Sequence, residues 1–394
     1  EIAQCLVGSE MCIRDSFKTV YECRKLFTTP IPNERLYDLT IKKVDENKAS
    51  AEAGFKISGT GAITETWEAE TRDGIADITF IVDELLGKYS GKARLILTEI
   101  STEEGLQVHT GNLAEIEIDL DKLKSLDTDG SFTVVSHDPE FVKVDYTGSS
   151  IGLTVENRQI PVNLTLIKKE KDKETYLAGA EFTVTVNGGK ADGRQIKVET
   201  DGTSKGKTVS LPWAESYSIQ ETRAPEGYIL DPTVYDYSLE EFESRMDDSG
   251  TVLLAKNLSV LKENPVITGN LRVRKVDAQN GASLSGAVFE IRKGAPPESY
   301  DEAGTDVYEK VGTVTIGPDG TGEYTNLPYG AYFLREITAP DGYQLSKELI
   351  PFAIEQVMQT VELDVPNRRL EGELTILKVD SENNQKPLAG AVFT

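Results

Sequence analysis

The chain has 394 residues, of which 38% are hydrophobic and 27% are charged, and its formal net charge is −24 at pH 7. This composition is typical of a globular protein, and the length predicts two to four domains. The negative charge argues against nucleic acid or an anionic membrane as a partner, and no apolar run reaches the roughly 18 residues that a membrane span needs. All three cysteines lie in the first 23 residues, so the rest of the chain must be stable without disulfides.

The N-terminal sequence EIAQCLVGSEMCIRDS, residues 1–16, shares no pattern with the rest of the chain. It resembles translated sequencing-adaptor read-through and is excluded from the fold prediction; a genuine N-terminal segment is the alternative. Residues 17–33 are expected to end an upstream repeat. In IPNERLYDLTIKK, Asn33 precedes Lys43 by ten positions, much as a later VPN precedes its own lysine.

Four stretches share a strand pattern that carries a lysine. Their sequences are LTIKKVD, LTLIKKE, LRVRKVD and LTILKVD, and their lysines are Lys43, Lys168, Lys275 and Lys378. Side chains alternate between the two faces of a strand, so each lysine shares a face with two apolar residues. The second copy has Lys169 and Glu170 where the others have valine and aspartate, and the alternation selects Lys168 as the inward-facing lysine.

Two further stretches, YSIQETRAPEGY (217–228) and YFLREITAPDGY (332–343), match each other at nearly every position. LILTEISTEEGL is a weaker copy that lacks the Ala-Pro pair and the tyrosine. In all three, the alternation ends with a glutamate on the apolar face; these residues are Glu99, Glu221 and Glu336. A carboxylate in a core is costly unless it is paired.

A third signature is an inward-facing asparagine at the end of a strand, in LTVEN, LLAKN and LDVPN; these residues are Asn157, Asn257 and Asn367. Taken singly, a buried lysine suggests a snorkelling side chain and an asparagine suggests a strand-end cap. The recurrence of lysine, glutamate and asparagine in register favours instead a mutually satisfied buried trio.

The segments between the signatures contain Asp-Gly and Asn-Gly turns, and helical periodicity is brief, so we predict an all-β fold. The acidic loop DLDKLKSLDTDG lacks the ligand spacing of a calcium loop, and no metal is expected. The signatures predict an enlarged first repeat at 34–160, a second at 161–262, a third at 263–370 and the start of a fourth at 371–394.

Such a trio can form an intramolecular amide. Burial disfavours charge, so a neutral lysine amine is expected as nucleophile and a protonated glutamate as hydrogen-bond donor to the asparagine carboxamide oxygen. The acid would then pass a proton to the departing ammonia. Holding amine and carboxamide in contact supplies the effective molarity that so poor an electrophile requires.

The KVD…LaGAvF opening, the ETrAPeGY box and the strand-end asparagine resemble the B-type, prealbumin-like repeats of collagen adhesins and pilins of Gram-positive bacteria. The resemblance implies tandem inverse immunoglobulin-like β-sandwiches, each with a Lys–Asn isopeptide bond and a catalytic glutamate. The implied bonds join Lys43 to Asn157, Lys168 to Asn257 and Lys275 to Asn367, with Glu99, Glu221 and Glu336 as the acids. Asn33 and Lys378 are then unpaired within this sequence.

The resemblance implies an extracellular stalk at the cell surface or cell wall, carrying a head domain that contacts a host matrix protein or glycan. The alternative is that the first repeat binds such a ligand itself, through its extra segments and Trp67. A turnover enzyme is the least favoured reading, because His109 and His137 are the only histidines and no repeat contains a cysteine. No cofactor is expected, and the trio would act once on itself.

Overall fold

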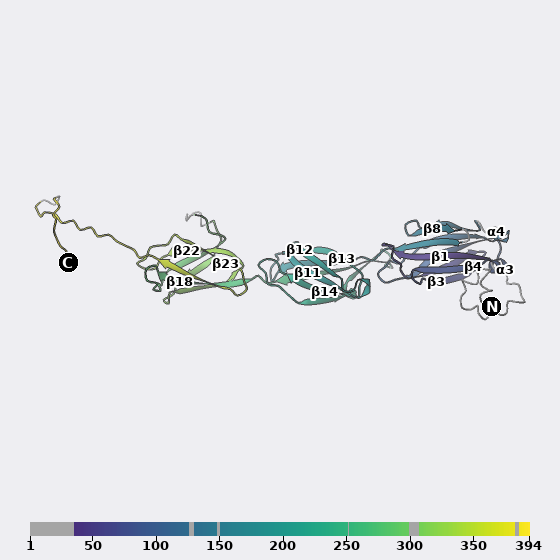
Figure 1. Cartoon of the computed structure of the whole chain (residues 1–394), viewed down its shortest axis with the longest axis horizontal. Helices are drawn as coiled ribbons and strands as arrows, with labels where there is room; N and C mark the ends of the chain where they lie inside the picture. Colours follow the sequence, from purple (N-terminus) through teal and green to yellow (C-terminus); the bar gives the residue numbers. More distant parts are fainter. Residues whose placement is uncertain (1–34, 126–129, 148–149, 251, 299–306, 383–385) are drawn as a thin grey trace, which may run out of the picture. The chain divides into compact units, whose positions relative to one another are not determined.

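The computed structural model describes residues 35–125, 130–147, 150–250, 252–298, 307–382 and 386–394. The proposed adaptor-derived segment, the residues of the upstream repeat and Asn33 lie outside this range. The described chain consists mainly of strands joined by turns, with two short α-helices, which confirms the all-β prediction (Figure 1). Its sheets pair into three β-sandwiches.

The first sandwich contains sheets ordered β4-β1-β9-β8 and β3-β2-β5-β6-β7. The first of these sheets is built from β1 (Leu36–Asp45), β4 (Ile75–Ile81), β8 (Val142–Thr147) and β9 (Ser150–Asn157). The second is built from β2 (Ala53–Gly61), β3 (Thr66–Glu70), β5 (Lys92–Thr102), β6 (Asn112–Asp119) and β7 (Phe132–His137). Helices α3 (Val82–Lys88) and α4 (Leu120–Lys124) complete it.

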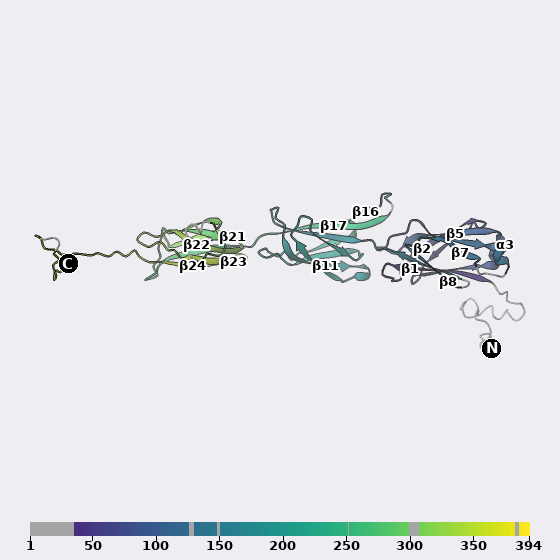
Figure 2. The same ribbon diagram turned by 90° about the horizontal axis from the view of Figure 1, so that it is seen from above.

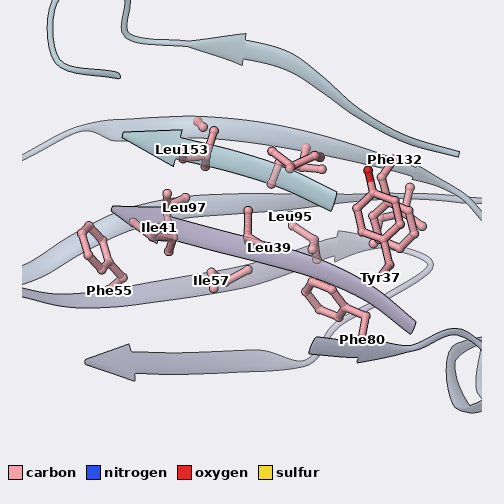
Figure 3. Packing of buried hydrophobic residues seen from close by; sticks show 14 of the residues in the cluster. Tyr37, Leu39, Ile41, Phe55, Ile57, Phe80, Leu95, Leu97, Phe132 and Leu153 are labelled. Carbon is pink, nitrogen blue, oxygen red and sulfur yellow. The ribbon is translucent and has the colours of Figure 1, made fainter. Parts of the chain in front are cut away.

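The core of this sandwich follows from the period-two alternation of its strands. Leu39 and Ile41 from β1 meet Ile57 from β2 and Leu95 from β5, and all four are fully buried (Figure 3). Each buried aliphatic side chain contributes roughly 1.5–3 kcal/mol relative to exposure. Tyr37 and Phe132 close one end of the core with stacked rings whose centroids lie 3.6 Å apart.

The second sandwich contains sheets ordered β13-β10-β17-β16 and β12-β11-β14-β15. The first sheet comprises β10 (Val162–Glu170), β13 (Lys207–Leu211), β16 (Glu243–Met246) and β17 (Leu253–Asn264); β16 lies at its edge beside β17 (Figure 2). The second comprises β11 (Ala178–Asn187), β12 (Gln195–Asp201), β14 (Ser216–Arg223) and β15 (Val234–Ser238), with 3₁₀ turns at Gly189–Ala191 and Leu239–Glu241. Strand β17 runs to Asn264, so the predicted boundary at residue 262 falls inside a strand.

The third sandwich contains sheets ordered β21-β18-β24 and β20-β19-β22-β23. Its strands are β18 (Thr268–Asp277), β19 (Val288–Lys293), β20 (Lys310–Thr315), β21 (Thr321–Pro328), β22 (Gly330–Thr338), β23 (Leu349–Ile354) and β24 (Thr360–Asn367). The first and last strands, β18 and β24, are parallel neighbours, with Asp277 opposite Asn367. Strands β1 and β9 pair in the same way, with Asp45 opposite Asn157.

Beyond β24, the segment that repeats the lysine-strand motif has exposed side chains, among them Lys378. The amide of Leu388 donates to the carbonyl of Lys378 (2.8 Å), as Leu284 does to Lys275 and Leu177 to Lys168. This one backbone hydrogen bond to the lysine carbonyl is therefore common to the three repeats.

Candidate crosslinking sites

Each sandwich brings one lysine, one glutamate and one asparagine together in its interior. The lysines lie on the first strands β1, β10 and β18, the glutamates on β5, β14 and β22, and the asparagines on β9, β17 and β24. The most exposed of these nine residues, Glu99, has only 6% of its surface exposed. The predicted inward facing of lysine and glutamate is found in all three repeats.

A β-bulge beside a phenylalanine sets the position of each glutamate. The register between the second strand and the glutamate strand shifts at Gly54/Phe55, at Glu181/Phe182 and at Val288/Phe289. After the shift, each phenylalanine lies directly opposite the glutamate of its repeat. The rings of Phe182 and Phe289 then lie 5.4 and 5.1 Å from the lysine Nζ of their own repeats. A bulge changes the direction of side chains, and here it packs a phenylalanine ring against the lysine amine.

The third site has the closest contact between amine and carboxamide. Lys275 Nζ lies 2.5 Å from Asn367 Oδ1 and 3.0 Å from Glu336 Oε1. Asn367 Nδ2 donates to both Glu336 oxygens at 3.0 Å. One carboxyl group therefore contacts both the attacking nitrogen and the nitrogen that would leave.

The second site uses a different asparagine from the one predicted. Lys168 Nζ lies 2.7 Å from Asn264 Oδ1 and 3.1 Å from Glu221 Oε1, and Asn264 Nδ2 lies 2.8 Å from the same glutamate oxygen. Asn257 is partly exposed and accepts instead from Asn163 Nδ2 (3.0 Å). The pairing of Lys168 with Asn257 is therefore wrong, and Asn264 takes its place.

The physical reason is the length of β17, which continues past Asn257 to Asn264. Asn257 contacts Asn163 near the start of β10, whereas the carbonyl of Asn264 accepts from the Lys171 amide just after the end of that strand (2.9 Å). The Asn367 carbonyl accepts from Ala278 in the same way. The sequence did contain the signal: Asn264 precedes Lys275 by eleven positions, the same spacing that separates Asn157 from Lys168.

The first site contains the predicted residues in a different arrangement. Lys43 Nζ donates to Glu99 Oε1 (2.5 Å), and Asn157 Nδ2 donates to the two Glu99 oxygens at 3.0 and 2.8 Å. Asn157 Oδ1 is buried without a hydrogen-bond partner among the described residues. Unlike its counterparts, this lysine therefore hydrogen-bonds the carboxylate and not the asparagine.

Burial lowers the pKa of Lys43, Lys168 and Lys275 below the ordinary lysine value, and the adjacent glutamate of each site opposes this shift. Desolvation is the larger effect because the charged ammonium loses water. A greater fraction of each amine is therefore the neutral nucleophile at a given pH. We expected the acid to contact the carboxamide oxygen, but in each site the carboxyl group lies against the amide nitrogen.

Sequence reasoning missed the loop that follows each glutamate. The amide ten positions later donates to the second carboxyl oxygen: His109 N to Glu99 (2.7 Å), Asp231 N to Glu221 (3.0 Å) and Ser346 N to Glu336 (2.7 Å). The carbonyls of Gln107 and Gln344 accept from Asn157 and Asn367 Nδ2. The constant spacing between the glutamate and the rest of its box was a signal for this loop. The donors in the loop are backbone amides, however, and any residue type can supply a backbone amide.

The box tyrosines have a role that the sequence did not suggest. Tyr343 Oη donates to Asp277 Oδ2 (2.7 Å), and Tyr228 Oη donates to Glu170 Oε2 (3.2 Å). Each acceptor lies two residues after the buried lysine of its repeat. The hydrogen bond from Tyr343, together with those from Gln279 and Arg369, lowers the pKa of Asp277 to about 2.

Metal binding and membrane insertion are two other possibilities for the described ranges. Groups of three or more histidine, cysteine, aspartate or glutamate side chains that could hold a metal ion do not occur there. The helices of the same ranges are all too short or too polar to cross a membrane.

Comparison with known proteins agrees with this architecture. Residues 162–248 and 269–369 match the family described as SpaA, prealbumin-like fold domain. The TIE protein of Bacillus anthracis has a similar structure, with a TM-score of 0.55 and 20% identity over 85% of this chain and 51% of its own. This chain thus spans about half the length of that protein.

Two pilus proteins were also found. The major pilin subunit BcpA of Bacillus cereus has a TM-score of 0.37 and 14% identity over 85% of this chain and 100% of its own. The pilus adhesin SpaC of Lactobacillus rhamnosus GG has a TM-score of 0.34 and 16% identity over 86% and 44%. A search of curated protein sequences gives no match. The second and third sandwiches are prealbumin-like domains of the SpaA family, the pilin-type repeats that the sequence motifs resemble.

Proposed function

We propose that this chain is part of the structural stalk of a bacterial cell-surface adhesin or pilin-like protein, extracellular and attached to the cell wall, whose repeats lock themselves with Lys–Asn isopeptide bonds. The bonds join Lys43 to Asn157, Lys168 to Asn264 and Lys275 to Asn367. The observation that carries the proposal is the third site, where a buried amine lies 2.5 Å from a carboxamide oxygen beside a buried carboxyl group.

The positions of the atoms support the following reaction. The neutral Nζ of Lys275 attacks Cγ of Asn367, and the Nζ–Cγ bond forms as the carbonyl becomes tetrahedral. The Glu336 carboxyl group takes a proton from Nζ and returns one to Nδ2, because it contacts both nitrogens. The Cγ–Nδ2 bond then breaks and ammonia leaves. The amine and the carboxamide are held in contact, and this raises their effective molarity. The high effective molarity compensates for the low reactivity of the amide.

The same sites favour a stalk over a turnover enzyme. Each trio is consumed by its own reaction, and the product ties the first strand of a sandwich to its last strand. Pulling on the chain ends then loads a covalent bond instead of the hydrogen bonds between parallel strands.

The test is the intact mass of the folded full chain, because each bond removes one ammonia. Three bonds predict a deficit of three ammonia masses, and peptide mapping should find the Lys168 peptide joined to the Asn264 peptide. A mass equal to that of the sequence would remove the self-crosslinking mechanism.

A second candidate function is ligand binding by the first repeat, favoured by a groove of about 510 Å³ between β3 and β4. Its lining includes Trp67, Arg72 and the carboxylates Glu68, Glu70 and Asp77. Trp67 packs edge-on against Phe80, which holds its ring in place. A glycan array and a matrix-protein pull-down with the chain and its Trp67→Ala variant test this function. Saturable binding that the variant loses would support it, and absence of binding would leave the stalk as the sole proposal.

A further inference from the structure

The loop after each glutamate needs an anchor, because it holds both the carboxyl group and the asparagine. In the second and third repeats the anchor is the box tyrosine, whose hydroxyl reaches the acidic residue two positions after the lysine. The position of the tyrosine is shared by all repeats: Tyr228 and Tyr343 form isolated bridges to the residue two positions after the reactive asparagine. In the first repeat Leu106 makes the corresponding bridge to Gln159. A leucine has no hydroxyl to donate.

In the first repeat the loop is held instead by a contact between His109 and Asp138. His109, whose amide donates to Glu99, places Nε2 3.2 Å from Asp138 Oδ2. Its ring packs edge-on against Phe141, with centroids 4.9 Å apart. Its Nδ1 accepts from the Gly111 amide (3.2 Å). Both ring nitrogens of the imidazole and its packing against Phe141 therefore hold this one loop.

Asp138 is itself held firmly. Its amide donates to the Leu113 carbonyl (3.0 Å), and its Oδ1 accepts from the Glu140 amide (3.0 Å). The hydrogen bonds from Glu140 and from His109 lower the pKa of Asp138, so the carboxylate stays ionised. It belongs to the segment between β7 and β8, which is part of the extra sequence of the enlarged first repeat.

We propose that the His109–Asp138 pair is the first repeat's replacement for the box tyrosine, and that it positions Glu99 and Asn157 for reaction with Lys43. The proposal rests on the proposed self-crosslinking function. His109 is a positioning residue: its side chain contacts none of the reacting atoms, and only its backbone reaches Glu99. The extra sequence of this repeat thereby contributes to the crosslinking site.

The experiment follows bond formation in all three repeats of one molecule. The full chain is made by a pulse of cell-free synthesis, samples are quenched over time, and peptide mapping measures each crosslink. We expect His109→Ala and Asp138→Ala to slow the Lys43–Asn157 bond roughly 10- to 100-fold, the penalty associated with a small misplacement of reacting groups. The other two bonds serve as internal controls and should form at unchanged rates. His137→Ala is the matched control, because this exposed histidine is the direct neighbour of Asp138.

A rescue separates positioning from general destabilisation. Leu106→Tyr in the His109→Ala background restores the hydroxyl of the other repeats opposite Asp45, the residue two positions after Lys43. Recovery of the first bond supports the proposal. An unchanged rate in His109→Ala, equal slowing by His137→Ala, or no recovery with the tyrosine would overturn it. Failure of the proposed function is distinguishable, because the unsubstituted chain would then show no ammonia loss at any site, and this inference would fall with it.

Discussion

The first and third repeats contain the same lysine, glutamate and asparagine on equivalent strands. Their sites differ in the hydrogen bonding of the asparagine Oδ1. In the third, Asn367 Oδ1 accepts from Lys275; in the first, Asn157 Oδ1 has no partner among the described residues, and Lys43 hydrogen-bonds Glu99 instead. The surrounding β-bulge and phenylalanine are equivalent in both. The loop carbonyl accepts from the asparagine Nδ2 in both repeats. The difference therefore lies in where the lysine amine sits relative to the carboxamide oxygen, and the shared fold alone does not secure the reaction geometry.

The largest effect is expected from removing the acid of the third site. Glu336→Ala keeps Lys275 and Asn367 but abolishes proton transfer, so one ammonia loss should disappear from the intact mass. Closing a loop of this length contributes about 4–5 kcal/mol by the loop-entropy estimate for disulfides, so the variant should melt earlier and become sensitive to trypsin. An unchanged mass deficit would mean that the glutamate is only a hydrogen-bond partner.

The second repeat offers a matched pair of asparagine substitutions on one strand. Asn264→Ala should abolish the bond to Lys168. The mass deficit of the full chain should then fall from three ammonia masses to two. Asn257→Ala should leave the deficit intact, because its side chain contacts Asn163 at the far end of β10. Peptide mapping that finds Lys168 joined to Asn257 would contradict the geometry described above.

The first repeat should crosslink more slowly than the third. Its lysine begins in contact with the carboxylate, so Asn157 must reorient before Nζ can reach Cγ. Time-resolved peptide mapping of the freshly made chain should show the Lys43–Asn157 bond lagging behind the Lys275–Asn367 bond. Simultaneous completion of both would remove the functional difference between these sites.

A smaller effect concerns acid stability, which the box tyrosine should confer on the third repeat. The pKa of Asp277 is lowered to about 2, so its contribution to stability is fully present above the ordinary aspartate value and is lost as pH falls through 2. Tyr343→Phe removes the leading cause of that shift and should move the acid unfolding of this sandwich to higher pH. Circular dichroism during acid titration, in the bond-free Glu336→Ala background, measures it. Coincident acid transitions with and without the hydroxyl would show that the tyrosine is not the cause.

The sequence was sufficient to predict the all-β sandwich fold and the inward facing of lysine and glutamate, because alternation with period two depends on residue type alone. The sequence did not predict that Phe55 lies opposite Glu99, because the bulge at Phe55 depends on pairing between distant strands. The alternation within the short motif LLAKN points to Asn257, whereas the eleven-residue spacing to the next lysine points to Asn264. The loop anchors Tyr343 and His109 could not be predicted, because their partners are brought close only by the completed fold.

The parallel register of β18 and β24 has a consequence for how far the stalk can stretch. Both strands run in the same direction, and Lys275 and Asn367 lie near their carboxyl ends. With the bond formed, a path along the covalent chain enters through β18, crosses at Lys275 and leaves after Asn367, bypassing all the residues between. An unbonded repeat that unfolds releases roughly 3.3–3.6 Å for every residue it contains. A bonded repeat has almost no hidden contour length to release, so it behaves under tension as a segment of fixed length.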